Sequence, residues 1–165
     1  MPIVLVRIDD RLIHGQIVQG WLKSINVNRI VVASDSVADD TIQQMLMSMA
    51  VPSGIDLDIK KVSDAADAFV RGDYDKENTM LLFSNPADVL FMLDKGAKIK
   101  SVNVGGMHFV HGKRQLLCNL SVDDIDVKNL YNIYSRGVEI EGRILPADER
   151  TNLISLVEKE YEKCR

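Results

Sequence analysis

The stretch PIVLVRIDDRLIHGQ, residues 2–16, begins with an apolar run of strand length and continues into a charged segment that precedes a helical pattern. The run at residues 3–6 is typical of a strand buried on both faces of a parallel sheet. Two arginines, two aspartates and one of the chain's three histidines lie at or just after the end of this run. The segment therefore predicts a buried strand with charged side chains at its carboxyl end.

The same alternation of strand and helix patterns continues along the chain. Strands are expected at residues 2–8, 29–34, 55–62, 79–84, 99–104 and 138–144, and helices near 16–25, 37–50, 63–71, 86–95, 122–136 and 149–163. Such alternation is typical of α/β domains. We predict a single α/β domain with a mainly parallel β-sheet, flanked by helices on both faces, and a short antiparallel edge. Residues 105–118 predict a functional loop leading into that edge strand.

Two of the predicted helices carry an apolar face that we expect to pack in the core rather than to contact a cofactor. The residues on these two faces are Ile42, Met45, Leu46 and Met49 of helix 37–50, and Val127, Leu130, Tyr131 and Tyr134 of helix 122–136.

Composition excludes several classes of protein. Of the 165 residues, 46% are hydrophobic and 27% are charged, and the formal net charge of −4 argues against a general nucleic-acid binder. No apolar stretch reaches the roughly 18 residues of a membrane-spanning helix, and the first residues resemble a strand rather than a secretion signal. Cys118 and Cys164 match no metal or redox spacing, so we expect free thiols, with a disulfide as the less favoured alternative. A cytoplasmic protein is expected.

Three predicted strand ends carry residues suited to binding or catalysis. They are residues 9–15, 84–86 and 105–107. Ligands of open parallel sheets bind at the carboxyl ends of the strands, so some of these segments are expected to meet. Strand order decides which of them adjoin, and the sequence leaves that order open.

The segment around His14 suits phosphoryl transfer. A neutral imidazole carries a lone pair that can attack phosphorus or accept a proton. Arg11 offers a planar donor for phosphate oxygens, and Gly15 and Gln16 begin a helix whose N–H groups attract anions. Local chemistry alone leaves the alternative open that this is an ordinary loop held by ion pairs.

A resemblance to a known family favours the first interpretation. RIDDRLIHGQ (7–16), VNRIVVASDSVADD (27–40), MLLFSNPADVL (80–90), IKSVNVGGMHFVHGKRQ (99–115) and SVDDID (121–126) resemble, in this order, the IIB components of the bacterial sugar phosphotransferase system (PTS), mannose/fructose/sorbose family. The resemblance covers residues 1–165 as one IIB domain.

This resemblance implies a phosphocarrier. His14 would accept a phosphoryl group from a PTS IIA protein, with Arg11 holding it, and pass it to a sugar imported by the membrane components IIC and IID. The implied location is cytoplasmic, with peripheral membrane association through these partners. No metal or other cofactor is implied. The GGMHF and GK-R-Q residues most resemble amino-sugar members, which is weak evidence on the sugar, and whether the chain is a monomer or a homo-oligomer stays open.

Further residues are predicted around the phosphate. Asp9 and Asp10 are both candidates to orient His14 or Arg11, with their order of importance left open. Ser84 and Asn85 are expected to cap the following helix or to reach the site. The loop with Gly106, Met107, His108 and Lys113 is expected to face a partner. Residues 106–114 miss the P-loop spacing, and His108 and His111 lack further ligands for zinc, so nucleotide and metal sites are not expected.

The alternative from another class is a non-catalytic α/β module that binds a phosphorylated metabolite at the same loop. Both interpretations use Arg11 and a helix N-terminus, so affinity for phosphate does not separate them.

Overall fold

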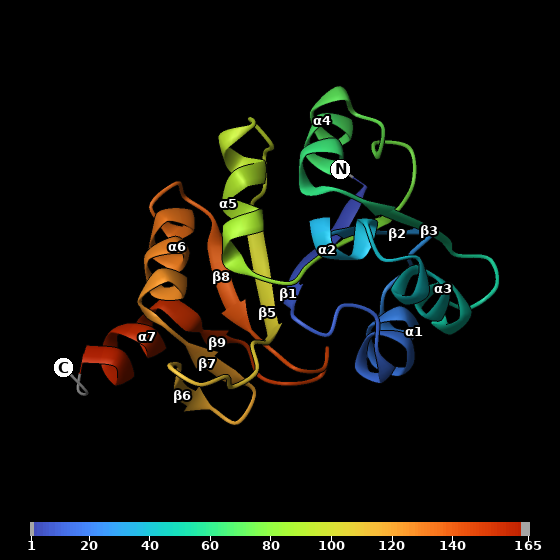
Figure 1. Cartoon of the computed structure of the whole chain (residues 1–165). Helices are drawn as coiled ribbons and strands as arrows, with labels where there is room; N and C mark the ends of the chain where they lie inside the picture. Colours follow the sequence, from blue (N-terminus) through green and yellow to red (C-terminus); the bar gives the residue numbers. More distant parts are fainter. Residues whose placement is uncertain (1, 163–165) are drawn as a thin grey trace.

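In residues 2–162, which the computed structural model describes, a seven-stranded sheet carries helices on both faces and a two-stranded hairpin stands beside it (Figure 1). In chain order the elements are β1 (Ile3–Asp9), η1 (Gln16–Trp21, a π-helix), α1 (Leu22–Ser24), β2 (Arg29–Ala33), α2 (Asp35–Ala38), α3 (Thr41–Ala50), β3 (Asp56–Lys60), α4 (Val62–Arg71), β4 (Thr79–Phe83), α5 (Pro86–Asp94), β5 (Ser101–Gly106), β6 (Arg114–Leu117), β7 (Leu120–Val122), α6 (Asp124–Tyr134), β8 (Glu139–Gly142), β9 (Thr151–Asn152) and α7 (Leu153–Glu162).

Strand order places the first strand in the middle of the sheet. The order is β3-β2-β4-β1-β5-β8-β9, and every pair is parallel except β8 and β9. The predicted parallel sheet and its short antiparallel edge are therefore confirmed. Because β1 lies between β4 and β5, the three chemically marked strand ends adjoin at one edge of the sheet.

Two hydrophobic cores lie on opposite faces of the sheet, because successive side chains of a strand point to opposite sides. On one face Val31 and Leu81 pack with residues of α4, α5, α6 and α7. On the other face Val32 and Met80 pack with Ile17 of η1 and with residues of α2 and α3. Figure 1 shows α5, α6 and α7 on one side of the sheet and α1 and α3 on the other.

The predicted helix 37–50 is two helices. The first ends at Ala38. Asp40 has extended backbone and its carboxylate accepts hydrogen bonds from the N–H groups of Ile42 and Gln43, so it caps the second helix, α3. The predicted helix 149–163 begins only at Leu153, because residues 151–152 pair with β8. Its last predicted residue lies outside the described part of the chain.

The apolar face predicted to pack in the core from α3 is exposed, so that prediction is wrong. The exposed fractions of Ile42, Met45, Leu46 and Met49 are 65%, 58%, 60% and 78%. Met47 is the buried residue of α3, and the side chain of Gln44 on the inner side donates hydrogen bonds to carbonyls of α2. In α6, by contrast, Val127 and Leu130 are buried as predicted, although Tyr134 is exposed.

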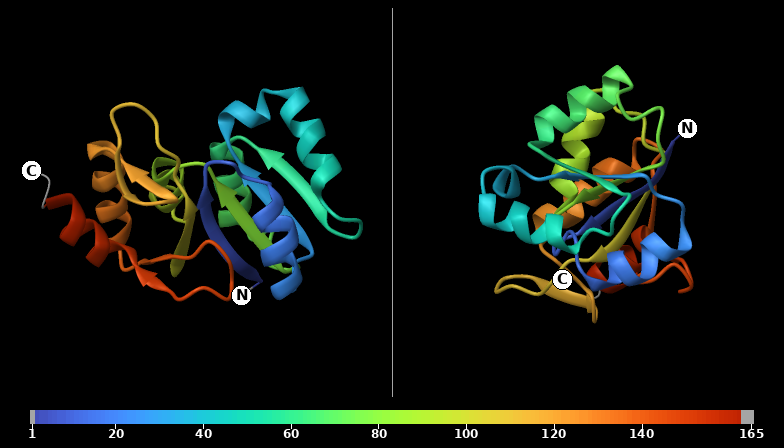
Figure 2. Two further views of the ribbon diagram at one scale, coloured as in Figure 1. Left: turned by 90° about the horizontal axis from the view of Figure 1, so that it is seen from below. Right: turned by 90° about the vertical axis from the view of Figure 1, so that its right-hand side faces the viewer.

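Residues 105–118 form less of a loop than the sequence suggests. Gly105 and Gly106 continue β5, and Arg114–Leu117 forms a hairpin with β7 that stands off the main sheet (Figure 2). The loop proper is therefore residues 107–113, and β6 is not an edge of the main sheet. None of the helices in residues 2–162 has the length and apolar character needed to span a bilayer.

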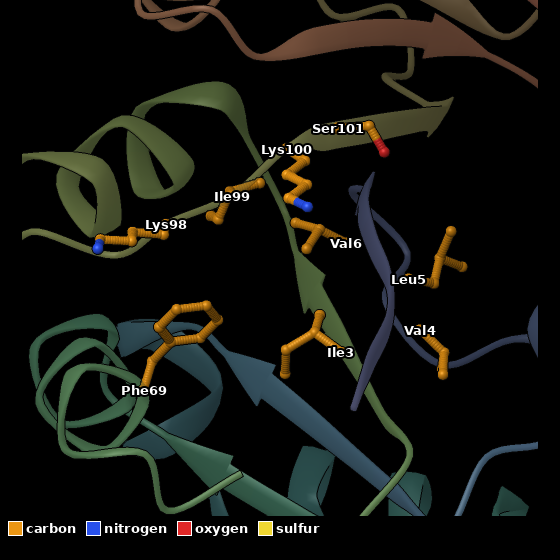
Figure 3. A pocket seen from close by; sticks show the side chains of 9 residues that line it. All are labelled: Ile3, Val4, Leu5, Val6, Phe69, Lys98, Ile99, Lys100 and Ser101. Atoms are coloured by element: carbon orange, nitrogen blue, oxygen red, sulfur yellow. The ribbon is translucent and has the colours of Figure 1, made fainter. Parts of the chain in front are cut away.

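A partly open cavity of about 280 Å³ lies at the amino ends of β1 and β5. The strands pair only from Arg7 and Asn103 onward, and they leave a gap before that point. Figure 3 shows Ile3 and Val6 directed toward Phe69, with Lys98 and Lys100 nearby. This cavity is at the edge of the sheet opposite His14, so it is not part of the site described next.

Candidate functional site

The candidate site is the loop that leaves β1 at the carboxyl edge of the sheet. Asp9 is the last residue of β1, and residues 10–15 lead into η1. Asp9 pairs with Gly106 of β5, and the N–H of Asp10 donates to the Gly106 carbonyl at 3.0 Å. The loop that carries His14 is thereby joined to the start of the 107–113 loop.

The buried carboxylate of Asp9 is the hub of the site. Its Oδ2 lies 3.0 Å from Nη2 of Arg7 and 2.8 Å from Nε2 of His14. Its Oδ1 accepts a hydrogen bond of 3.2 Å from the main-chain N–H of Arg11, whose Nε lies 3.7 Å away. Burial alone raises the pKa of the Asp9 carboxyl, but the hydrogen bond from His14 and the charge of Arg7 bring it below its ordinary value. Asp9 is therefore an anion at neutral pH.

Arg7 is the buried positive charge that pairs with the Asp9 carboxylate. Its guanidinium is fully buried and donates to Asn103 Oδ1 at 2.5 Å and to the carbonyls of Arg143 and Ile144 at 2.9 and 3.3 Å. It also lies 5.2 Å from the ring centre of Trp21. Burial lowers the pKa of Arg7 despite the neighbouring Asp9 carboxylate, yet an arginine stays charged at neutral pH.

The network continues to a second ion pair. The amide nitrogen of Asn103 donates to Glu141 at 3.1 Å, and Glu141 accepts from Arg143 at 2.9 Å. Arg143 lies on the Trp21 ring at 5.1 Å, and the Trp21 indole N–H donates to the Ile144 carbonyl at 2.9 Å. Trp21 is 2% exposed, so its ring is packed in the core. These buried charges balance, which leaves Arg11 as the excess positive charge near His14.

The pair Gly105-Gly106 makes room for this network. A Cβ on Gly105 would lie 1.8 Å from Nη2 of Arg7, which is far inside contact distance. A Cβ on Gly106 would lie 3.2 Å from Asp9 Oδ1. Neither glycine has a positive φ, so the requirement is for space and not for an unusual backbone. The glycines are needed because Arg7 and Asp9 lie against the β5 backbone.

The position of Asp9 decides which ring nitrogen of His14 is free. A carboxylate can only accept hydrogen bonds, so the contact at Nε2 places the proton on that nitrogen. The lone pair then resides on Nδ1, which accepts a hydrogen bond of 3.4 Å from the main-chain N–H of Gln16. The His14 side chain is 13% exposed. The ring is held in one orientation by these contacts at its two nitrogens, and Nδ1 is the nitrogen that carries the lone pair.

Arg11 and the start of η1 complete the surroundings of Nδ1. Arg11 Nη2 donates to the side chain of Gln16 at 2.8 Å, and its side chain is 43% exposed. Gly15 caps η1 at φ −52°, and the N–H groups of Ile17 and Val18 both donate to the His14 carbonyl. π-helices are rare in proteins, and those that occur are often found at functional sites. Here it begins directly beside the histidine.

An open groove of about 560 Å³ runs beside His14. It is lined by Arg11, His14, Gly15, Gln16, Gln19, Gly20 and Leu145. Leu145 comes from the segment after β8, and a Cβ on Gly20 would lie 2.8 Å from its Cδ2. The groove gives a reacting group of another molecule access to His14.

Several predicted site residues occupy other places. The carboxylate of Asp10 points to His108 and forms no hydrogen bond with His14 or Arg11 in the described part of the chain. Gly106 and Met107 are buried, so they cannot face a partner, and the reason is that β5 extends through Gly106. Of the predicted partner-facing loop, His108 is exposed, and Lys113 is half-buried and paired with Asp126 at 2.8 Å.

Ser84 and Asn85 lie at the carboxyl end of β4, next to β1. Asn85 caps α5 by accepting from the N–H of Asp88 at 2.9 Å, and Pro86 occupies the first helical turn. The capping role is confirmed. Within residues 2–162 neither side chain forms a hydrogen bond with the His14 loop.

The sequence left open whether Asp9 or Asp10 orients His14, and it did not predict that Asp9 is buried on Arg7 as the centre of the site. A signal was available, because alternate residues of a strand share one side, so Arg7 and Asp9 point together and Asp10 points away. No group of three or more His, Cys, Asp or Glu residues in the described chain is placed to hold a metal ion. Cys118 is an exposed free thiol, and Cys164 lies outside the described residues.

The arrangement suits nucleophilic attack by a histidine on an anionic group. Asp9 orients the ring and would neutralise the positive charge that develops on it, and Arg11 and the main-chain N–H of Gln16 are the donors beside His14 for oxygens of a phosphoryl group. A metal is not required for these roles.

Comparison with known proteins gives consistent matches over nearly the whole chain. The family described as "PTS system sorbose subfamily IIB component" matches residues 3–165. The mannose-specific EIIAB component of the PTS of Escherichia coli K12 is 42% identical over 159 residues, which are 96% of this chain and 49% of that protein. This chain thus spans about half the length of that relative.

Relatives of similar length are also found. The fructose-specific EIIB component of Bacillus subtilis is 40% identical over 157 residues, covering 95% of this chain and 96% of that one. The crystal structure of the IIBSor domain of the sorbose permease from Klebsiella pneumoniae superposes with a TM-score of 0.91 at 34% identity, covering 96% and 98% of the two chains.

Proposed function

This chain belongs to the sorbose subfamily of PTS IIB components, and we propose that it carries phosphoryl groups on Nδ1 of His14. The observation that carries the proposal is the contact of 2.8 Å between His14 Nε2 and the buried Asp9 carboxylate. This contact leaves Nδ1 as the nucleophile and places a counter-charge behind the ring. Arg11 and the main-chain N–H of Gln16 hold the transferred group.

The transfer is written as an exchange of one phosphorus–nitrogen bond for another. The bond between phosphorus and the donor histidine breaks while a bond to His14 Nδ1 forms, and the donor ring keeps the electron pair of the broken bond. His14 keeps its Nε2 proton on the hydrogen bond to Asp9. Catalysis of such a step consists mainly of positioning and neutralisation of charge. Asp9 positions the ring, and Arg11 neutralises charge on the phosphoryl group.

We propose a PTS IIA protein as the donor, and the sugar bound by membrane components IIC and IID as the final acceptor. The name of the E. coli relative, an EIIAB component, supports the donor, because that protein combines A and B parts in one chain. Relatives are named for mannose, fructose, sorbose and N-acetylgalactosamine. The proposed substrate class is therefore a hexose or amino sugar. The proposed place of action is the cytoplasmic surface of the membrane, reached through these partners.

The test is phosphorylation of the purified protein. The wild type is incubated with phosphoenolpyruvate, the general PTS proteins and a IIA protein, and its intact mass is measured without acid. We expect one added phosphoryl group that is labile in acid and stable in base. His14→Ala should gain none and should remain folded, because a loop side chain contributes little to the core. His111→Ala, at an exposed position, is the matched control and should be phosphorylated like the wild type.

Phosphorylation of His14→Ala to the wild-type extent contradicts the assignment of His14. A wild-type protein that gains no mass while several IIA donors are phosphorylated favours the alternative, a module that binds a phosphorylated metabolite without a covalent step. The ring nitrogen is tested by long-range ¹H–¹⁵N spectra of the phosphorylated protein. A phosphoryl group on Nε2 would contradict the role given to Asp9.

A further inference from the structure

Two consecutive aspartates each hold a histidine. Asp9 holds His14 through Nε2 from inside the sheet. Asp10 points outward, where its Oδ2 accepts the main-chain N–H of His108 at 2.7 Å and its Oδ1 contacts the Nδ1 of the His108 ring. Both carboxylate oxygens of Asp10 are therefore engaged by one residue of the 107–113 loop.

The backbone between the two histidine contacts is strained. Leu12 has a φ of +56°. Among the residues that the structure describes, it is the only one besides glycines with a positive φ. It is 3% exposed, and its N–H donates to the Asp9 carbonyl at 2.9 Å. A leucine in this region persists only where its surroundings hold it, and such strain clusters at functional sites. The contacts of Asp10 lie two residues before Leu12 and four before His14.

From this geometry we infer that His108 is a positioning residue for His14, which it serves by fixing the carboxylate of Asp10. The inference rests on the proposed function. The main-chain N–H at position 108 would be present with any residue except proline, so the imidazole contributes the second contact. With both contacts in place, the Asp10 carboxylate cannot turn toward the guanidinium of Arg11.

That restriction has a direct consequence for phosphoryl transfer. Arg11 is the excess positive charge beside His14, and Asp10 is its neighbour in the chain. A mobile Asp10 carboxylate would draw Arg11 away from Gln16 and would add negative charge beside an incoming phosphoryl group. His108 thus keeps the negative charge of Asp10 away from the phosphoryl group. It also holds the loop that contains Leu12 in its strained conformation.

Exposure makes the role testable without loss of the fold. The side chains of His108 and Asp10 are 49% and 32% exposed, so their replacement opens no cavity in the core. His111 is three residues further along the same loop and is exposed, without a hydrogen bond or ion pair in residues 2–162. It provides the matched control.

The experiment compares three variants with the wild type in single-turnover transfer from a phosphorylated IIA protein. We expect His108→Ala to transfer roughly tenfold more slowly, since small displacements of a reacting group lower rates strongly. His108→Asn should recover most of the rate, because its side-chain N–H can replace the Nδ1–H. His111→Ala should match the wild type, and melting temperatures of all variants should stay within about 2 °C.

The second readout is the ¹⁵N spectrum of the His14 ring in the unphosphorylated proteins. His108→Ala should shift the His14 signals, whereas His108→Asn and His111→Ala should leave them near the wild-type positions. Equal transfer rates for His108→Ala and the wild type overturn the inference. Slow transfer with unchanged His14 signals also overturns it, because His108 would then act by touching the donor.

This design separates the inference from the proposed function. If the wild type accepts no phosphoryl group, the proposed function fails, and the His14 spectra still decide whether His108 controls the ring. If the wild type is phosphorylated and His108→Ala behaves like His111→Ala in both measurements, only the inference fails.

Discussion

The substitution Gly105→Ala should destabilise the protein by displacing the guanidinium of Arg7. The new Cβ would lie 1.8 Å from Nη2, 1.9 Å from Cζ and 2.3 Å from Nη1 of Arg7. Carbon atoms in contact are normally about 3.5–4.0 Å from their neighbours, so the guanidinium must move by more than an ångström. It would then lose its hydrogen bonds to Asp9, Asn103 and two main-chain carbonyls.

The magnitude follows from the fact that this ion pair is fully buried. Breaking a buried, hydrogen-bonded pair destabilises a protein by about 3–5 kcal/mol. For a chain of this size, each kcal/mol lowers the melting temperature by roughly 2–4 °C, so we expect a decrease of about 6–20 °C. Thermal unfolding followed by circular dichroism measures it. Gly15→Ala is the control, since its Cβ would meet nothing within 4 Å and its φ is −52°.

A double-mutant cycle tests the cause. Arg7→Met removes the group that Gly105→Ala displaces, so most of the cost of Gly105→Ala should vanish in the Arg7→Met background, a coupling of about 2 kcal/mol or more. The reasoning is refuted if Gly105→Ala melts within about 2 °C of the wild type. It is also refuted if the substitution has the same cost with and without Arg7.

Three further predictions follow from the site and the surface. Arg11→Ala should fold normally, because the Arg11 side chain is largely exposed. The variant should accept phosphoryl groups about 10–100 times more slowly, because the charge of the phosphoryl group is no longer neutralised. An unchanged rate in single-turnover transfer would remove Arg11 from the mechanism. Because the pKa of Asp9 is lower in the folded protein than its ordinary 3.8, Asp9 contributes stability above that pH, and the contribution is lost as pH falls through the lowered value. The melting temperature of Asp9→Asn should therefore be lower at neutral pH and fall less steeply below pH 3.8 than that of the wild type, and parallel curves would speak against this. Leu46→Gln should change the free energy of unfolding by no more than about 0.5 kcal/mol because Leu46 is exposed, whereas Met47→Gln should destabilise measurably; a large loss for Leu46→Gln in urea unfolding would show that it is buried.

The position of the sheet could be predicted from the sequence because buried parallel strands leave continuous apolar runs between helical patterns. The site could be predicted in part for a related reason, since functional groups gather where parallel strands end. The resemblance to the IIB family then singled out His14 and Arg11. That all three marked strand ends adjoin depends on β1 lying between β4 and β5, and this follows from long-range pairing that no local pattern encodes.

Two features resisted prediction for physical reasons. Arg7 and Asp9 are fully buried charges, and a charged residue in a strand pattern normally indicates the end of burial. Their mutual pairing and the space left by Gly105 make burial possible. In α3 the pattern identified an apolar face correctly but could not tell on which side the body of the protein lies. Asp40 sets the start of α3, and Gln44 occupies part of its inner side.

The outward-facing methionines of α3 also affect how the protein responds to oxidants. Met45 and Met49 are 58% and 78% exposed, whereas Met80, Met92 and Met107 are at most 2% exposed. A peroxide would therefore convert the two helix methionines to sulfoxides first, while the buried thioethers stay reduced. The modification turns an uncharged apolar strip into a polar one without opening either core. A preparation stored in air would change the chemistry of this surface before any loss of folded structure became visible.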